Sequence, residues 1–145
     1  MIHIGIDPGK AGGIAAIFHD GQAAAYATPA SERDIYDVIH SLVVGEEAQC
    51  CARIERVASS PQMGVVSAFT FGRGYGGLLM ALTALRIPFE EVLPRTWQKE
   101  LGCLTGGDKN VSKRRAQQLF PQLKVTHAIA DALLIAEFCR RTHKG

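Results

Sequence analysis

The chain opens with a strict alternation of apolar with polar or small positions, which places three isoleucines on one face of residues 2–7. This period of two predicts a β-strand with one buried face. A second apolar run covers residues 14–18, and a third extended run follows an Asp-Gly turn over residues 22–27. Because the connecting loops are short, the three strands are expected to form an antiparallel meander.

Beyond residue 30 the pattern alternates between helical and extended segments. Ser31, followed three residues later by Asp34, is typical of a helix N-terminus, and apolar residues then recur along one helical face as far as Val43. The later segments are a strand at 52–57, a helix at 65–85, a strand at 89–93, a helical turn at 94–97, a basic amphipathic helix at 112–120 and a mostly buried helix at 128–141.

This order predicts an α/β fold built on a five-stranded mixed sheet, with an antiparallel meander first, parallel strands after it, and helices on its flanks. It is the element order of the ribonuclease H-like fold. No internal repeat or linker interrupts the chain, so we expect one domain over residues 1–145.

Composition does not alter the expected fold class, but the charged residues are unevenly distributed along the chain. Sixteen basic and 14 acidic side chains leave a net charge of +2, but residues 95–124 hold seven basic against two acidic side chains. The four cysteines lack metal-site spacing and are expected to be reduced core residues. No signal peptide and no uninterrupted apolar stretch of ~18 residues is present, which predicts a cytoplasmic protein without a membrane partner.

Three carboxylates lie among apolar neighbours. Asp7 ends the first strand, Glu55 lies in the strand at 52–57, and Asp131 lies in the apolar last helix. A buried carboxylate is costly unless it is paired or binds a metal, so together they favour a site for Mg²⁺, with Mn²⁺ as a substitute. Each has a structural alternative: a turn cap at Asp7, an ion pair with a neighbouring arginine at Glu55, and a surface charge at Asp131.

The same segments carry a family resemblance. Residues 4–9 (IGIDPG) with 12–15 (GGIA) resemble the first motif of the RuvC-type Holliday junction resolvases. Residues 54–57 (IERV) are similar to that family's second acidic strand, and 130–136 (ADALLIA) to its C-terminal helix motif. The Gly-rich Phe71–Gly77 segment and 93–97 (LPRTW) match its small phage and bacterial branch. The resemblance spans nearly the whole chain in the right order.

The resemblance implies a homodimeric, metal-dependent endonuclease that cuts four-way and other branched DNA junctions by paired symmetric nicks. Asp7, Glu55 and Asp131 would be its metal-binding and catalytic carboxylates. Two cations ~4 Å apart can activate water and stabilise the leaving oxygen. His127 precedes Asp131 by four residues, so both face the same side of a helix, and we predict it as a fourth catalytic group. A local hydrogen bond at the helix start is its alternative.

Two segments are predicted to contact DNA. Near the last helix, basic side chains would bind the phosphate backbone, although a basic helix face is otherwise ordinary solvated surface. In the glycine-rich stretch, aromatic and basic side chains would reach the junction centre, although helix packing explains the same residues. The predicted DNA-binding residues are Lys99, Lys109, Lys113, Arg114, Arg115, Phe69, Arg73 and Tyr75.

Two other functions are compatible with the predicted fold. A ribonuclease H-like RNA-processing nuclease and a non-catalytic junction-binding scaffold share the predicted fold, whereas an actin-like or sugar-kinase ATPase needs two such domains. A homodimer is expected because one metal site cuts one strand, and a twofold axis matches the symmetry of the junction. The helix at 65–85 is the predicted interface, since its glycines permit close approach.

Overall fold

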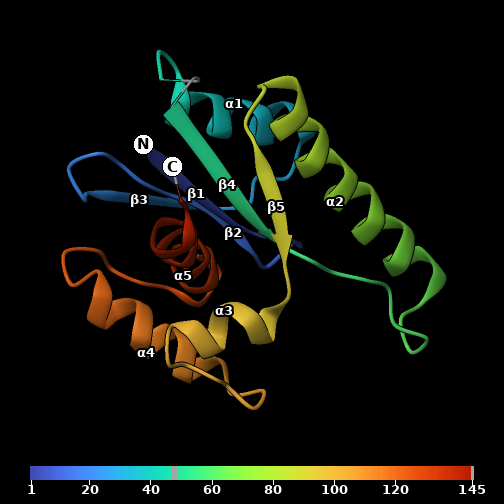
Figure 1. Cartoon of the computed structure of the whole chain (residues 1–145). Helices are drawn as coiled ribbons and strands as arrows, with labels where there is room; N and C mark the ends of the chain where they lie inside the picture. Colours follow the sequence, from blue (N-terminus) through green and yellow to red (C-terminus); the bar gives the residue numbers. More distant parts are fainter. Residues whose placement is uncertain (47–48, 145) are drawn as a thin grey trace.

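The computed structural model describes residues 1–46 and 49–144, and its centre is a five-stranded sheet in the order β3-β2-β1-β4-β5 (Figure 1). The first three strands are antiparallel neighbours, while β4 runs parallel to β1 and β5 runs parallel to β4. The predicted mixed sheet is confirmed. Its strands are β1 (Ile2–Asp7), β2 (Gly13–Ile17), β3 (Ala23–Ala27), β4 (Cys50–Glu55) and β5 (Phe89–Val92).

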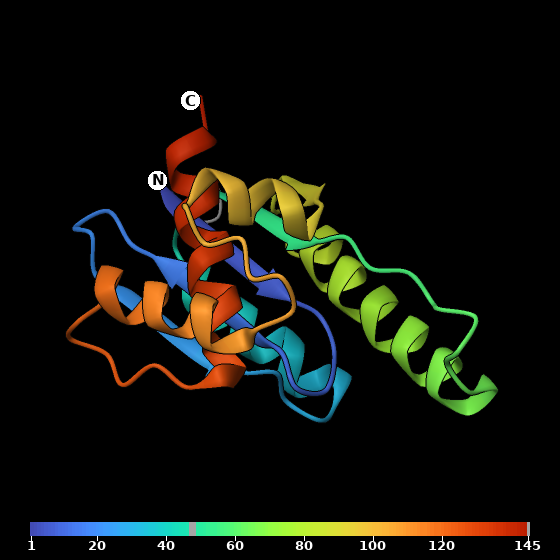
Figure 2. The same ribbon diagram turned by 90° about the horizontal axis from the view of Figure 1, so that it is seen from below.

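Helices cover both faces of the sheet (Figures 1 and 2). One apolar cluster joins the isoleucines of β1 to α1 and α2, and a second joins β2 to α3, α4 and α5. Each side of the sheet therefore has its own core. The helices are α1 (Glu32–Val43), α2 (Val65–Ala84), α3 (Pro94–Glu100), α4 (Lys109–Leu119) and α5 (His127–Thr142).

The bounds of β4 and α4 are among those that differ from the sequence predictions. Strand β4 begins at Cys50 rather than at residue 52 and ends at Glu55, because the apolar cysteines pair with β1 and Glu55 is the last residue to pair with β5. Helix α4 begins at Lys109, which the sequence had placed in a loop. Asp108 caps this helix by accepting a hydrogen bond from the amide of Asn110 (2.9 Å). As a result, Glu55 is the last residue of β4 and Lys109 is the first residue of α4.

Glycines let α5 lie unusually close to the middle of the sheet. A Cβ atom on Gly5 would stand 2.2 Å from the backbone nitrogen of Ala136, and one on Gly13 would stand 2.5 Å from the carbonyl oxygen of Ala128. No side chain fits at either position without moving the helix. The four cysteines are buried and form no disulfide, as predicted.

Helix α2 has an exposed apolar surface. Its N-terminal half extends past the sheet (Figure 2), and Val65, Val66, Phe69 and Met80 are exposed there and further along the helix. Among the described residues it is the one helix whose length and composition would suffice to cross a membrane, with a mean hydropathy of 1.2. Only 17% of that window is buried within the chain. Such a surface is typical of a contact with another molecule.

Candidate active site

Two of the carboxylates lie side by side at one edge of the sheet. Ile6 pairs with Ile54 in the parallel register of β1 and β4, so the next residues, Asp7 and Glu55, end adjacent strands. Along each strand the alternate residues before them face α5: Gly5 underlies the helix backbone, and Cys51 contacts Cys139. Since side chains alternate between faces, both carboxylates project toward α5.

The third carboxylate, Asp131, lies near the start of α5 and acts on both of the others. Burial raises the pKa of Asp7 to about 8, and repulsion from Glu55 and Asp131 adds to the effect. Burial also raises the pKa of Glu55, with Asp131 contributing. The three groups therefore share one poorly solvated, negatively charged region, although they come from the beginning, middle and end of the chain.

A buried indole donates a hydrogen bond to one of these carboxylates. The Nε1 atom of Trp97 in α3 lies 2.8 Å from Oε2 of Glu55, and the Trp97 side chain has no exposed surface. This bond opposes the rise in the pKa of Glu55 that burial causes. Sequence reasoning did not assign a function to Trp97. The only available signal was a lone tryptophan directly after the Pro94 helix start.

Cationic and polar groups surround Asp131. Burial raises its pKa, while a hydrogen bond from Ser112 and the charges of Lys109 and His127 act in the opposite direction. Lys109 also lowers the pKa of Asp7. His127 is the exposed first residue of α5, one helical turn before Asp131. The start of α4 thus brings Lys109, which is predicted to contact DNA, close to the carboxylates.

The chemistry of this site suits a hard cation, although its side chains do not converge on a single point. In the described part of the chain, no three His, Cys, Asp or Glu side chains converge closely enough to hold a metal ion. Asp7, Glu55 and Asp131 offer carboxylate oxygens only, the donors that Mg²⁺ and Mn²⁺ prefer. Burial raises the pKa of all three carboxyl groups, and repulsion from neighbouring carboxylates adds to the effect at Asp7 and Glu55; a divalent cation would offset this cost.

The predicted basic residues of the α3–α4 region divide into two groups. Lys99, Lys109 and Arg114 are exposed, and Lys113 is half-buried. Arg115 instead donates its Nε hydrogen to the carbonyl oxygen of Leu101 (2.9 Å), which ties α4 to the end of α3. Gln117, also on α4, forms hydrogen bonds with backbone groups of the segment that follows the helix. Arg115 therefore has a structural contact in addition to its predicted contact with DNA phosphate.

The candidates on α2 also divide. Phe69 is 72% exposed and has a clear path to a partner. Arg73 forms an ion pair with Glu32 of α1 (3.0 Å), and the Tyr75 hydroxyl donates a hydrogen bond to Glu91 of β5. These two contacts connect α2 to its neighbours, whereas the Phe69 ring is largely exposed.

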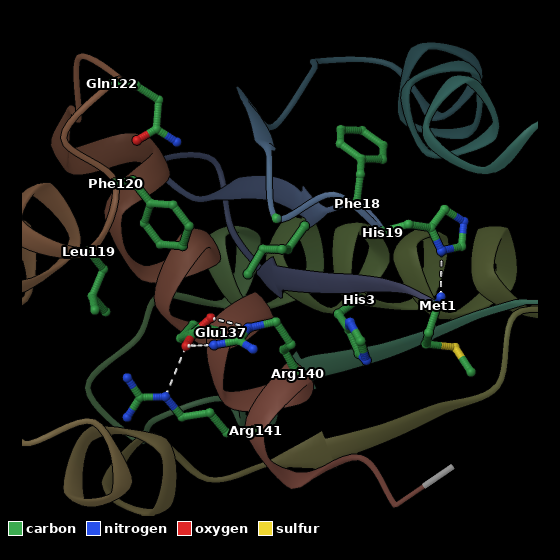
Figure 3. Close-up of a pocket in the computed structure, with 12 residues that line it drawn as sticks. Met1, His3, Phe18, His19, Leu119, Phe120, Gln122, Glu137, Arg140 and Arg141 are labelled. Atoms are coloured by element: carbon green, nitrogen blue, oxygen red, sulfur yellow. Dashed lines mark hydrogen bonds and ion pairs between the residues drawn. The ribbon is translucent and has the colours of Figure 1, made fainter.

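Figure 3 shows a cavity of about 680 Å³. Met1 and His3 line it at the start of β1, whereas Asp7 ends that strand, so the cavity lies away from the carboxylates. It is lined by the start of β1, the β2–β3 turn and the ends of α4 and α5. On its wall, Glu137 accepts hydrogen bonds from Arg140 (2.6 and 2.8 Å) and Arg141 (2.9 Å), which hold the pKa of this carboxyl down despite its burial. This ion-pair cluster shares no residue with the carboxylate site.

Solved structures share this fold. No protein-family profile and no curated protein matches the chain. A RuvC structure from Thermus thermophilus aligns with a TM-score of 0.60 and 19% identity, over 94% of this chain and 91% of that one. T. thermophilus RuvC in complex with a Holliday junction substrate aligns with a TM-score of 0.61 and 18% identity, over 94% and 90%. The chain therefore has the RuvC-like, ribonuclease H-like fold that its motifs predict.

Proposed function

We propose that this protein is a divalent-metal-dependent endonuclease that resolves four-way DNA junctions by paired, symmetric nicks. The observation that carries the proposal is the juxtaposition of Asp7 and Glu55, at the ends of adjacent strands, with Asp131 near the start of α5. Burial of Asp7 and repulsion from the other two carboxylates raise the pKa of Asp7 to about 8. Holding three poorly solvated carboxylates together is costly unless a positive charge compensates them. On a RuvC-like fold, a cation that also binds a scissile phosphate is the compensation that fits best.

Asp7, Glu55 and Asp131 would hold Mg²⁺ or Mn²⁺. The bound metal supplies an activated water and stabilises the leaving oxygen during phosphodiester hydrolysis. Before metal binds, Asp7 carries a proton at neutral pH because its pKa is about 8. It must lose that proton to become a ligand, so metal affinity is expected to increase with pH up to about that value.

Neighbouring side chains have separate tasks in this proposal. Lys109, whose charge already acts on Asp7 and Asp131, binds the phosphate beside the metal site. His127, one turn before Asp131, holds or releases a proton at the exposed edge of the site. Both assignments extend the family resemblance to positions that the fold places next to the carboxylates.

DNA would lie along the exposed basic side chains of α3 and α4. Lys99, Lys113 and Arg114 bind phosphates there without reading the base sequence. Arg115 supports this surface through its hydrogen bond to Leu101, which connects α4 to the end of α3. One of the similar structures is described as a complex with a Holliday junction, which supports a branched substrate for this chain. The exposed Phe69 would stack on an unpaired base at the junction centre.

A homodimer in the cytoplasm completes the proposal. The exposed apolar side chains of α2 would meet those of a second copy, which brings two carboxylate sites to two opposed strands. Arg73 and Tyr75 support this surface by holding α2 against α1 and β5.

The test is cleavage of a synthetic four-way junction with Mg²⁺, compared with linear duplex and structured RNA. We expect symmetric nicks in wild-type protein, none in the Asp7→Asn and Asp131→Asn variants, and junction binding in all three. Asp37→Asn, which makes the same change on exposed α1, is the matched control and should cut normally. Cleavage of RNA alone would favour the RNA-processing nuclease, and binding without cleavage would favour the scaffold.

A further inference from the structure

The hydrogen bond between Trp97 and Glu55 links two segments that are 42 residues apart. An indole nitrogen can only donate, and a buried donor needs a partner. Here the partner is a carboxylate that is itself poorly solvated, so the bond serves both groups. Hydrogen bonds to charged groups are among the stronger ones in proteins.

The indole is held too firmly to follow the carboxylate if it moves. Trp97 has no exposed surface and packs in the cluster formed by α3, α4 and α5, together with Leu101 and Ala116. Its N–H bond therefore has a fixed direction and engages Oε2 of Glu55, while hydrogen-bonding capacity remains at Oε1. A carboxylate held at one oxygen presents the other in a defined orientation.

We propose that Trp97 is a positioning residue, which orients the Glu55 carboxylate for binding the divalent cation. This inference rests on the metal site of the proposed function. The opposing interpretation is that Trp97 is only a core residue whose N–H needed an acceptor. The two interpretations make different predictions. If Trp97 positions Glu55, removing its N–H weakens metal binding more than the loss of a comparable packing contact does.

Trp97→Phe separates them, because it keeps an aromatic ring and removes the donor. Phe120→Leu is the matched control, since Phe120 packs in the same cluster and its loss removes aromatic packing without touching a carboxylate. Binding of Mn²⁺ to the full chain, measured by electron paramagnetic resonance of the free ion, should weaken about 10- to 100-fold in Trp97→Phe. The control should bind as wild type does. The proposal would be overturned if Trp97→Phe bound Mn²⁺ as tightly as the wild-type protein, or if both variants lost the same amount of Mn²⁺ affinity.

A second measurement needs no variant at position 97. Trp97 is the only tryptophan, so the intrinsic emission of the wild-type protein reports on the neighbourhood of Glu55. Saturating Mg²⁺ should shift that emission, and Glu55→Gln should remove the shift. Constant emission at Mg²⁺ concentrations that displace bound Mn²⁺ would refute the proposal. Metal-linked emission in a protein that cuts no junction would instead refute the proposed function alone.

Discussion

Replacing Asp7 with asparagine should stabilise the metal-free protein while it abolishes cleavage. Asp7 is half-buried, and both its poor solvation and its carboxylate neighbours raise its pKa to about 8. The native state therefore resists ionisation of this group, whereas the unfolded chain ionises it freely. Asparagine has a similar size and no charge, so it removes this conflict.

The sign of the effect follows from proton binding. Between pH 4 and pH 8 the native state holds a proton on Asp7 that the unfolded state has lost, so the free energy of unfolding falls as the pH increases. Each unit of pKa displacement corresponds to about 1.4 kcal/mol. From pH 5 to pH 9 this amounts to roughly 4 kcal/mol, and relaxation of the site reduces it to about 2–4 kcal/mol.

The assay is urea denaturation of wild-type protein and Asp7→Asn at pH 5 and pH 9 in the presence of a chelator. We expect the advantage of the variant to grow by about 2–4 kcal/mol between these pH values, since only the wild-type protein pays the ionisation cost. Added Mg²⁺ should stabilise the wild-type protein more than the variant. A difference between the two proteins that does not change with pH would refute the electrostatic reasoning.

Three further predictions test the fold, the DNA surface and the dimer. Gly5→Ala should destabilise the protein by about 2–4 kcal/mol in urea denaturation, because the added Cβ would meet the α5 backbone. Gly72→Ala should instead stabilise α2 by about 0.5–1 kcal/mol, because an added Cβ would have no atom within 4 Å. Lys109→Ala with Lys113→Ala should weaken junction binding alike for all sequences and reduce its salt dependence in titrations, and an unchanged salt slope would place DNA elsewhere. Phe69→Asp should convert the dimer to monomer in light scattering and abolish paired nicking, so a wild-type protein that stays monomeric with and without junction DNA would exclude this assembly.

The local pattern of the chain was enough to predict the elements and their order. The alternating isoleucines of residues 2–7 could face only an apolar core, which left Gly5 and Asp7 on the other face of the strand. The capping of α1 by Ser31 was also readable, because its hydroxyl accepts the amide hydrogen of Asp34 only three residues away. Such features depend on neighbours along the chain, and motif resemblance extended them to a RuvC-like fold.

Contacts between distant segments were decided only by the tertiary structure. No spacing rule connects Trp97 with Glu55, and none predicts that Arg73 and Tyr75 bind Glu32 and Glu91 on other elements. Lys109 reached the carboxylates because Asp108 starts α4 early. The site itself exists because glycines in β1 and β2 let α5 approach the sheet, and that approach depends on the space left by absent side chains, which a one-dimensional pattern does not record.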